Sequence, residues 1–196
     1  MKWFACLFLL AAPFWESKAP ADWTEEELQS LLTDSPWAET IAAPAQGDAP
    51  PLLVYLATAA PMEAAERERD RRYKRKRPNE PVDPLAEEYR AWLAENRTTA
   101  IVLTINIGRV HGLDIEPDAG RMEQECVMHV GRKKLKMIGH FPPSTGDPYL
   151  RLAFPREVSP TDKSVTFELY LPGVAMPYRT VEFKVKDMML KGKLEI

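Results

Sequence analysis

Apolar and polar side chains alternate with a period of two through much of the chain from residue 99 onward. Because successive side chains of a strand point to opposite faces of a sheet, each alternating segment is predicted to be a strand with one buried face. The apolar members of four such segments are Ile101, Leu103, Ile105 and Ile107; Leu150, Leu152 and Phe154; Val165, Phe167, Leu169 and Leu171; and Val181, Phe183 and Val185. Two further apolar segments, 126–130 and 135–138, flank 131–134 and predict a hairpin.

The first half of the chain shows a helical pattern instead. Thr24 and Glu27 have the spacing of a capping box. Leu28, Leu31 and Leu32 follow as an apolar stripe on one side of a helix. A short helix is therefore predicted to begin at Thr24 and to end near residue 33.

One early strand and two longer helices are predicted further along this half. The apolar segment 52–57 reads as a strand, and a helix follows from Pro61 to about Lys76. The segment 78–84 interrupts the helical pattern because Pro, Asn and Asp favour turns there. A second helix is predicted from Pro84 to about residue 95.

Two connecting segments complete this half. Ser35 and Pro36 predict one more turn of helix, with Ser as the cap and Pro at the first helical position. Trp37, which follows, is expected in the core. The segment 44–51 is predicted to be a loop or linker because it contains three prolines and a glycine.

These elements predict an α+β fold. Two or three short helices and one early strand, in residues 22–98, are expected beside a mainly antiparallel β-sandwich in residues 99–196, either Ig-like or a partly open barrel. The 175 residues from 22 to 196 are enough for one domain with one core.

The start of the chain is typical of a secretory signal. Lys2 precedes the apolar segment 3–15, and Ala19 and Ala21 occupy the −3 and −1 positions of a cleavage site ahead of Asp22. Thirteen apolar residues fall short of the roughly 20 that a helix needs to cross a membrane. We therefore expect residues 1–21 to be a signal peptide that is removed. The protein is then exported, either to the periplasm or out of the cell, and has no integral membrane span after cleavage.

A strongly basic segment, 67–77, carries a net charge of +6 on the predicted helix. Such a run can bind a polyanion or lipid headgroups. However, residues 22–66 carry a net charge of −9, and the basic run has only Tyr73 as an aromatic side chain for stacking on bases. We expect pairing within the protein rather than nucleic-acid binding, and polyanion or lipid-headgroup binding is the alternative.

An acidic segment resembles a calcium-binding loop in its spacing. Four acidic residues stand at the first, third, fifth and twelfth positions of an EF-hand-like loop: Asp114, Glu116, Asp118 and Glu125. The sixth position is Ala119 where the sharp turn requires Gly, Pro117 stiffens the loop, and the flanks read as strands. An acidic loop between strands is the preferred interpretation, and calcium is the alternative.

No catalytic, cofactor-binding or metal-binding residue is predicted. Cys126 and His129 point to opposite faces of one predicted strand, so they cannot hold one metal ion together with His111 and His140. Cys126 also lacks a neighbour that would lower its pKa. The adjacent Glu87 and Glu88 face different directions on a helix. A catalytic triad assembled from residues far apart in the sequence is kept as an alternative.

Five aromatic side chains of the first half have two interpretations: Trp23, Trp37, Tyr55, Tyr89 and Trp92. Exposed aromatic side chains often mark a site that recognises a peptide or glycan. Aromatic side chains at helical spacing more often pin helices to a sheet. We expect these five in the core.

Both ends of the chain resemble a known but uncharacterised family of exported bacterial proteins. The similar segments are "WTEEELQSLLTDSPWAE" from Trp23, "FPR" from Phe154, "DKSVTF" from Asp162 and "FKVKDMMLKGKLEI" from Phe183. The resemblance implies a bacterial, exported protein that forms a single unit. It carries over no activity and no functional residue.

The sequence therefore favours a non-catalytic binding or structural module of the bacterial cell envelope. Its sheet edges, or the acidic segment around Asp114, would meet another envelope protein by strand addition. A hydrolase acting on envelope material is the alternative from a different functional class.

Overall fold

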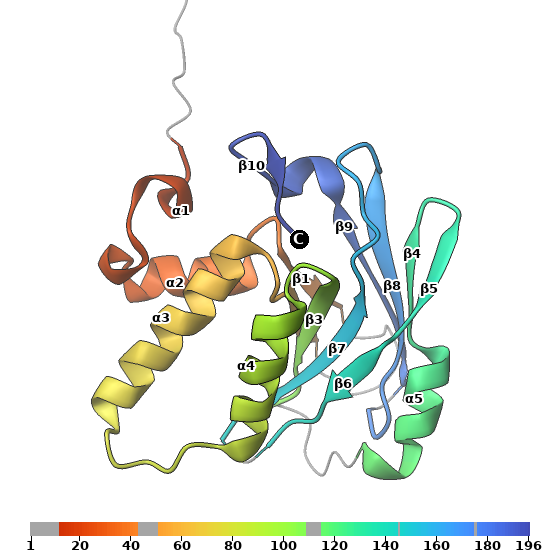
Figure 1. Cartoon of the computed structure of the whole chain (residues 1–196), viewed down its shortest axis with the longest axis horizontal. Helices are drawn as coiled ribbons and strands as arrows, with labels where there is room; N and C mark the ends of the chain where they lie inside the picture. The colour runs from red at the N-terminus through yellow and green to blue at the C-terminus, as the bar shows by residue number, and fades with distance from the viewer. Residues whose placement is uncertain (1–11, 43–50, 109–114, 145, 175) are drawn as a thin grey trace, which may run out of the picture.

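A computed structural model describes residues 12–42, 51–108, 115–144, 146–174 and 176–196 of the chain. The fold is α+β, with two open antiparallel sheets stacked as a sandwich and helices over the outer face of one sheet (Figure 1). The predicted fold class is therefore confirmed. The predicted loop at 44–51 and most of the signal segment lie outside the described residues, as do His111 and Asp114; the side chain of Glu116 is likewise not described.

The larger sheet has five strands in the order β1-β2-β3-β7-β6. Its strands are β1 (Ala38–Ile41), β2 (Leu52–Leu56), β3 (Ala100–Asn106), β6 (Gly139–Phe141) and β7 (Tyr149–Pro155). All of its neighbouring strands run antiparallel. The central pair is the longest, with seven residue pairs from Ala100 opposite Pro155 to Asn106 opposite Tyr149.

The smaller sheet has four antiparallel strands in the order β5-β4-β8-β9. Its strands are β4 (Val127–Val130), β5 (Lys133–Lys136), β8 (Ser164–Tyr170) and β9 (Tyr178–Lys184), and a separate short pair is formed by β10 (Met189–Leu190) and β11 (Lys193–Leu194). The predicted hairpin forms, but its turn is only Gly131 and Arg132, so Lys133 and Lys134 belong to β5. Gly131 adopts the positive φ of +57° that this tight turn requires.

The two sheets meet through aromatic side chains. The Phe154 ring on β7 packs against Phe167 on β8 at 5.2 Å between centroids, and Phe167 packs against Phe183 on β9 at 6.1 Å. All three side chains are fully buried. Ile101 lies opposite Phe154, which places the odd-numbered apolar residues of β3 on this inner face.

The prediction of one buried face is wrong for the two central strands. β9 alternates strictly between buried and exposed side chains. In β3, by contrast, six of the seven residues are buried, so both faces of this strand are covered. Thr104 and Arg151, opposite each other on β3 and β7, are among the buried residues of the second face. The reason is a helical layer that covers this face, so its polar side chains contact protein instead of water.

The helices confirm most of the predicted boundaries. They are α1 (Phe14–Ser17), α2 (Glu25–Thr33), α3 (Ala60–Lys76), α4 (Pro84–Asn96) and α5 (Ala119–Glu125), with short 3-10 helices at Pro20–Asp22, Glu116–Asp118 and Val185–Met188. The capping box of α2 is complete, because Thr24 and Glu27 each accept a hydrogen bond from the other's backbone N–H. Among the described helices, none is both long and apolar enough to span a bilayer.

Two local predictions are wrong. Ser35 and Pro36 form a turn that leads into β1, not a turn of helix, because Ser35 pairs with Ala38 in an isolated bridge. The segment from Ala119 to Glu125 is a helix where a loop between strands was expected. Met122 explains this helix, since its buried side chain gives the short segment one apolar contact with the core.

Candidate functional site

A cleft of about 610 Å³ lies between α3, α4 and the turn that precedes β7. The two helices diverge over the covered face of the larger sheet, and the connection 77–83 joins them at the wide end (Figure 1). Seven cationic side chains, six acidic side chains and three tyrosines line it. The cleft is therefore the place where polar groups of the described chain converge.

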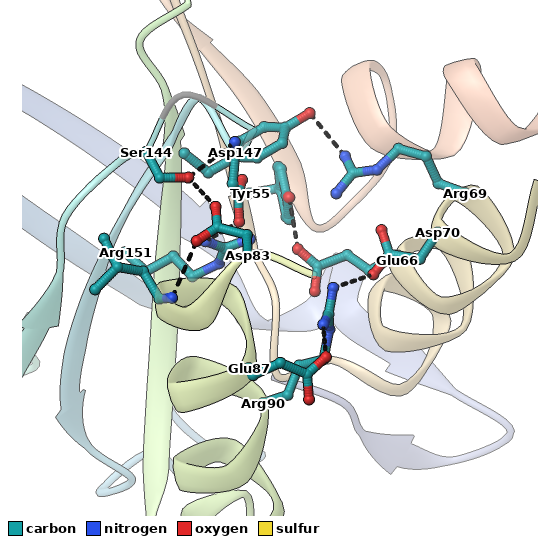
Figure 2. A network of polar contacts seen from close by, with 12 residues as sticks. Tyr55, Glu66, Arg69, Asp70, Asp83, Glu87, Arg90, Ser144, Asp147 and Arg151 are labelled. Carbon is teal, nitrogen blue, oxygen red and sulfur yellow. Dashed lines mark hydrogen bonds and ion pairs between the residues drawn. The ribbon is translucent and has the colours of Figure 1, made fainter. Parts of the chain in front are cut away.

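The wide end of the cleft is fixed by Asp83, the N-cap of α4. Its carboxylate accepts a hydrogen bond from the Leu85 backbone N–H at 3.0 Å and another from the Ser144 hydroxyl (Figure 2). The Ser144 hydroxyl in turn accepts one from the Asp147 backbone N–H at 3.1 Å. One carboxylate thus begins the helix and ties it to the turn before β7.

Arg151 and Tyr89 form part of the cleft floor. Arg151 is 5% exposed and Tyr89 is 3% exposed, and the guanidinium lies 4.2 Å from the centre of the Tyr89 ring. Arg151 Nη1 donates to Asp147 Oδ2 at 2.8 Å. Neither its Nε nor the Tyr89 hydroxyl makes a well-formed hydrogen bond to a described residue, although the guanidinium lies close enough to that hydroxyl to oppose the rise in the pKa of Tyr89 that burial causes. Buried polar atoms without partners are uncommon. These two belong to side chains that line the cleft.

Two charged side chains of α3, Glu66 and Arg69, are held by tyrosines of the sheet. The Tyr55 hydroxyl donates to Glu66 Oε1 at 2.6 Å, and Arg69 Nη1 donates to the Tyr149 hydroxyl at 2.7 Å (Figure 2). The Arg69 guanidinium also lies 4.7 Å from the centre of the Tyr149 ring. Burial raises the pKa of Tyr55 well above its usual value, and the Glu66 carboxylate adds to this shift, so the phenol stays a donor.

The other arginines of the cleft have carboxylate partners. These pairs are Arg67 with Glu63 at 3.2 Å, Arg97 with Glu63 at 3.1 Å, Arg77 with Glu80 at 3.5 Å, Arg90 with Asp70 at 2.9 Å and with Glu87 at 2.5 Å, and Arg151 with Asp147 at 2.8 Å. Arg69 differs, because no described carboxylate lies within 4.0 Å of its guanidinium. Glu66 likewise has no described cation within that distance.

Several cations of the basic run form ion pairs within the protein, as the sequence predicts, but their main partner is a residue of the run itself. Buried Glu68 accepts two hydrogen bonds from Arg71 and one from Arg72, all at 2.7 Å. Arg72 also pairs with Glu25 of α2 at 3.1 Å. The three remaining cations of the run, Lys74, Arg75 and Lys76, occupy the last turn of α3, where the helix dipole favours positive charge.

The second half of the segment with calcium-loop spacing is a helix, α5. Asp118 stands at the N-cap of α5 and Glu125 is its last residue, so the helix separates these two carboxylates. Glu125 instead pairs with Arg121 at 2.7 Å and accepts a hydrogen bond from Tyr178 at 2.6 Å. In the part of the chain that is described, no three His, Cys, Asp or Glu side chains are placed to share a metal ion.

The cysteine and the described histidines lie away from the cleft. Cys126 caps the C-terminus of α5 instead of lying within a strand, and its thiol contacts the Tyr170 backbone. Burial raises the pKa of Cys126 to about 11, so the thiol is neutral and unreactive near pH 7. His129 lies 3.1 Å from Glu168, and His140 lies 3.3 Å from Glu123.

Four of the five aromatic side chains examined in the sequence are buried, as expected: Trp23, Trp37, Tyr55 and Tyr89. Trp92 is partly buried against the core and lies 5.2 Å from the Phe141 ring. Tyr89 has a second role, because it also lines the cleft.

Comparison of the chain with family models, curated proteins and solved structures gave no match. The cleft is therefore assigned from its geometry. Of its residues, the sequence had singled out those of the basic segment 67–77, as an alternative polyanion site, and Tyr89, as a core aromatic or a recognition residue. The available signals were Arg151, a charged residue within an apolar strand, and the pair Glu66 and Arg69, which helical spacing places on the side of α3 that begins with the buried Met62.

The Glu68 pairing predicts a pH-dependent stability. The hydrogen bonds from Arg71 lower the pKa of Glu68 to about 2, burial opposes this shift, and the bond from Arg72 adds to it. Because the folded pKa lies below the unfolded value, the contribution is full above about pH 5 and declines as the pH falls toward 2. We expect Glu68→Gln to lower the free energy of unfolding by about 1–3 kcal/mol at pH 7, and by much less at pH 3.

Chemical denaturation at the two pH values measures this difference. Glu88→Gln is the matched control, since Glu88 is exposed and makes no ion pair with a described residue. An equal loss for Glu68→Gln at pH 7 and pH 3 would contradict the pairing.

Proposed function

We propose that the protein is a non-catalytic binding module whose ligand site is the cleft between α3 and α4. The observation that carries this proposal is the convergence of buried polar groups in a hollow of about 610 Å³. Sites for small organic molecules commonly have volumes of about 300–1,000 Å³ and a few placed polar groups. The ligand is accordingly a small polar organic molecule.

The composition of the cleft favours binding over hydrolysis. The described residues that line it include no histidine, cysteine, serine or threonine. The hydroxyl or thiol nucleophile of a serine, threonine or cysteine hydrolase therefore has no candidate among these side chains. Its charged groups are instead held in fixed positions by tyrosines and ion pairs, which suits recognition.

The same contacts favour a small ligand over a polyanion. Four arginines of the run, Arg67, Arg71, Arg72 and Arg77, already pair with carboxylates. A polyanion on this helix would find only Lys74, Arg75 and Lys76 of the last turn without displacing those carboxylates. A small molecule in the cleft leaves them in place.

We further propose that this module is exported and works in the bacterial cell envelope. The support is the signal-like start of the chain, with Lys2, the apolar segment 3–15 and the small residues Ala19 and Ala21. In the whole chain, Phe14 contacts Trp23 at 5.7 Å, and Trp15 contacts Trp37 at 6.0 Å. Cleavage ahead of Asp22 would remove both contacts and the Lys18–Glu27 ion pair, but it would keep the capping box of α2.

Export predicts a mature chain that begins at Asp22. Expression in a bacterium, separation of the envelope from the cytoplasm and N-terminal sequencing of the product check this. Replacement of Ala21 by a bulky residue should leave the precursor uncut. A product in the cytoplasm that retains Phe14 and Trp15 would contradict export.

Ligand binding in the cleft predicts a loss of binding when the cleft is filled. Ala94 is exposed and lines the cleft, so Ala94→Trp should block it without disturbing the core. Ala91, on the same helix, is exposed and does not line the cleft, so Ala91→Trp is the matched control.

The measurement is the thermal midpoint in the presence of a panel of organic acids, amines, amino acids, sugars and nucleotides. A ligand at about 100 times its Kd adds about 2.7 kcal/mol, which raises the Tm of a chain of this size by roughly 5–10 °C. We expect this rise in the unmodified protein and in Ala91→Trp, but not in Ala94→Trp. Equal rises in all three proteins would place the ligand elsewhere, and turnover of a panel compound would favour the hydrolase alternative.

A further inference from the structure

We infer that the ligand of the cleft is a zwitterion of the α-amino acid type, with its carboxylate on Arg69 and its ammonium group on Glu66. This inference rests on the proposed function and adds the chemical class of the ligand. Three observations carry it: two opposite charges that make no direct ion pair, the tyrosines that keep them apart, and unpartnered donors on the cleft floor.

Glu66 and Arg69 are opposite charges that share one cleft and attract each other across it, but they make no direct ion pair. Each is bonded to a neutral phenol, and neither has a described partner of opposite charge within 4.0 Å. Half-buried charges are costly when they lack both water and a counterion. A ligand that supplies one charge of each sign would satisfy both side chains at once.

The two tyrosines explain why Glu66 and Arg69 do not form an ion pair with each other. Tyr55 on β2 and Tyr149 on β7 pack edge to face, with 5.9 Å between ring centroids. Each phenol binds one of the two α3 side chains, so their hydroxyl groups hold the charges toward different strands of the sheet. Figure 2 shows Glu66 directed to Tyr55, and Arg69 directed to a separate ring.

The spacing of the two charges suits a compact zwitterion. Side chains three residues apart on a helix have Cβ atoms about 5–6 Å apart. The ammonium and carboxylate groups of an α-amino acid are attached to a single carbon, so one molecule can reach both side chains. A ligand with widely separated charges would leave one of them unpaired.

Unpartnered donors strengthen the carboxylate half of the site. Arg151 and Tyr89 are more than nine-tenths buried, both line the cleft, and neither the Arg151 Nε nor the Tyr89 hydroxyl makes a well-formed hydrogen bond to a described residue. Both atoms can donate a hydrogen bond. A carboxylate has two oxygens and about four acceptor positions, so it can use Arg69 together with at least one of these donors.

The cleft walls indicate an apolar or aromatic side chain on the ligand. Tyr73, Tyr89 and Tyr149 line the cleft together with Val82 and Leu93. Aromatic and aliphatic walls reward the burial of an apolar group. The probes are therefore the individual apolar and aromatic L-amino acids.

The test is calorimetric titration of the full chain with these amino acids, each compared with its N-acetyl and carboxamide derivatives. The N-acetyl form lacks the ammonium group, and the carboxamide lacks the carboxylate. We expect each derivative to bind the unmodified protein at least about tenfold more weakly than the free amino acid. Equal affinity of the free amino acid and both derivatives would overturn the inference.

Two variants assign each half of the ligand to its residue. Glu66→Gln should bind the free amino acid and its N-acetyl form with equal affinity, and Arg69→Met should lose most of the preference for the free amino acid over its carboxamide, because the remaining donors on the cleft floor hold the carboxylate less strongly. These comparisons within one variant are independent of any change in its stability. Arg75→Gln is the control, since Arg75 is an exposed residue of the same helix that does not line the cleft, and it should keep the preferences of the unmodified protein.

The outcomes separate this inference from the proposed function. If no amino acid binds but another panel compound binds in a way that Ala94→Trp abolishes, the zwitterion inference is wrong and the binding module stands. If neither an amino acid nor a panel compound binds, both are wrong.

Discussion

The structure depends on the burial of the larger sheet on both faces. One face of β3 and β7 packs against the smaller sheet through Phe154, Phe167 and Phe183. The other face carries polar side chains, among them Tyr55 and Arg151, that are as deeply buried as the apolar ones. Water cannot solvate these groups, so α3 and the neighbouring turns must supply their hydrogen-bond partners. Glu66 and Asp147 do so. The cleft follows from this constraint, because α3 and α4 diverge above a floor that is already polar.

The α3 helix serves two purposes on two sides. On the side that faces Trp23 and α2, buried Glu68 accepts hydrogen bonds from Arg71 and Arg72 and so neutralises part of the basic run. On the side that faces the sheet, Glu66 and Arg69 are directed to different tyrosines and make no ion pair with a described residue. A strongly charged helix can thus pair some of its charges within the protein and present others to a ligand. Its charge is a poor guide to its partners until the contacts of each side chain are known.

The sequence predicted the fold better than the site, for physical reasons that particular residues show. A period of two identifies a strand, but it does not say what covers the second face. Thr104 and Arg151 therefore read as solvent-facing positions although both are buried. The short helix α5 was missed because its seven residues contain one buried apolar side chain, Met122, which is too few for a helical period. The site was missed because its residues come from β2, α3, α4 and β7, and only the folded chain places Tyr55 beside Glu66 and Tyr149 beside Arg69.

The central claim is that phenols of the sheet, buried Tyr55 and partly buried Tyr149, hold the charges of α3 in place. A double-mutant cycle on the free energy of unfolding, with Tyr55→Phe, Glu66→Gln and the combined variant, tests it most directly. The account predicts a coupling energy of about 1–3 kcal/mol between the two residues, because the hydrogen bond joins a buried donor to a charged acceptor. Strictly additive effects of the two substitutions would contradict it, since the phenol and the carboxylate would then act independently.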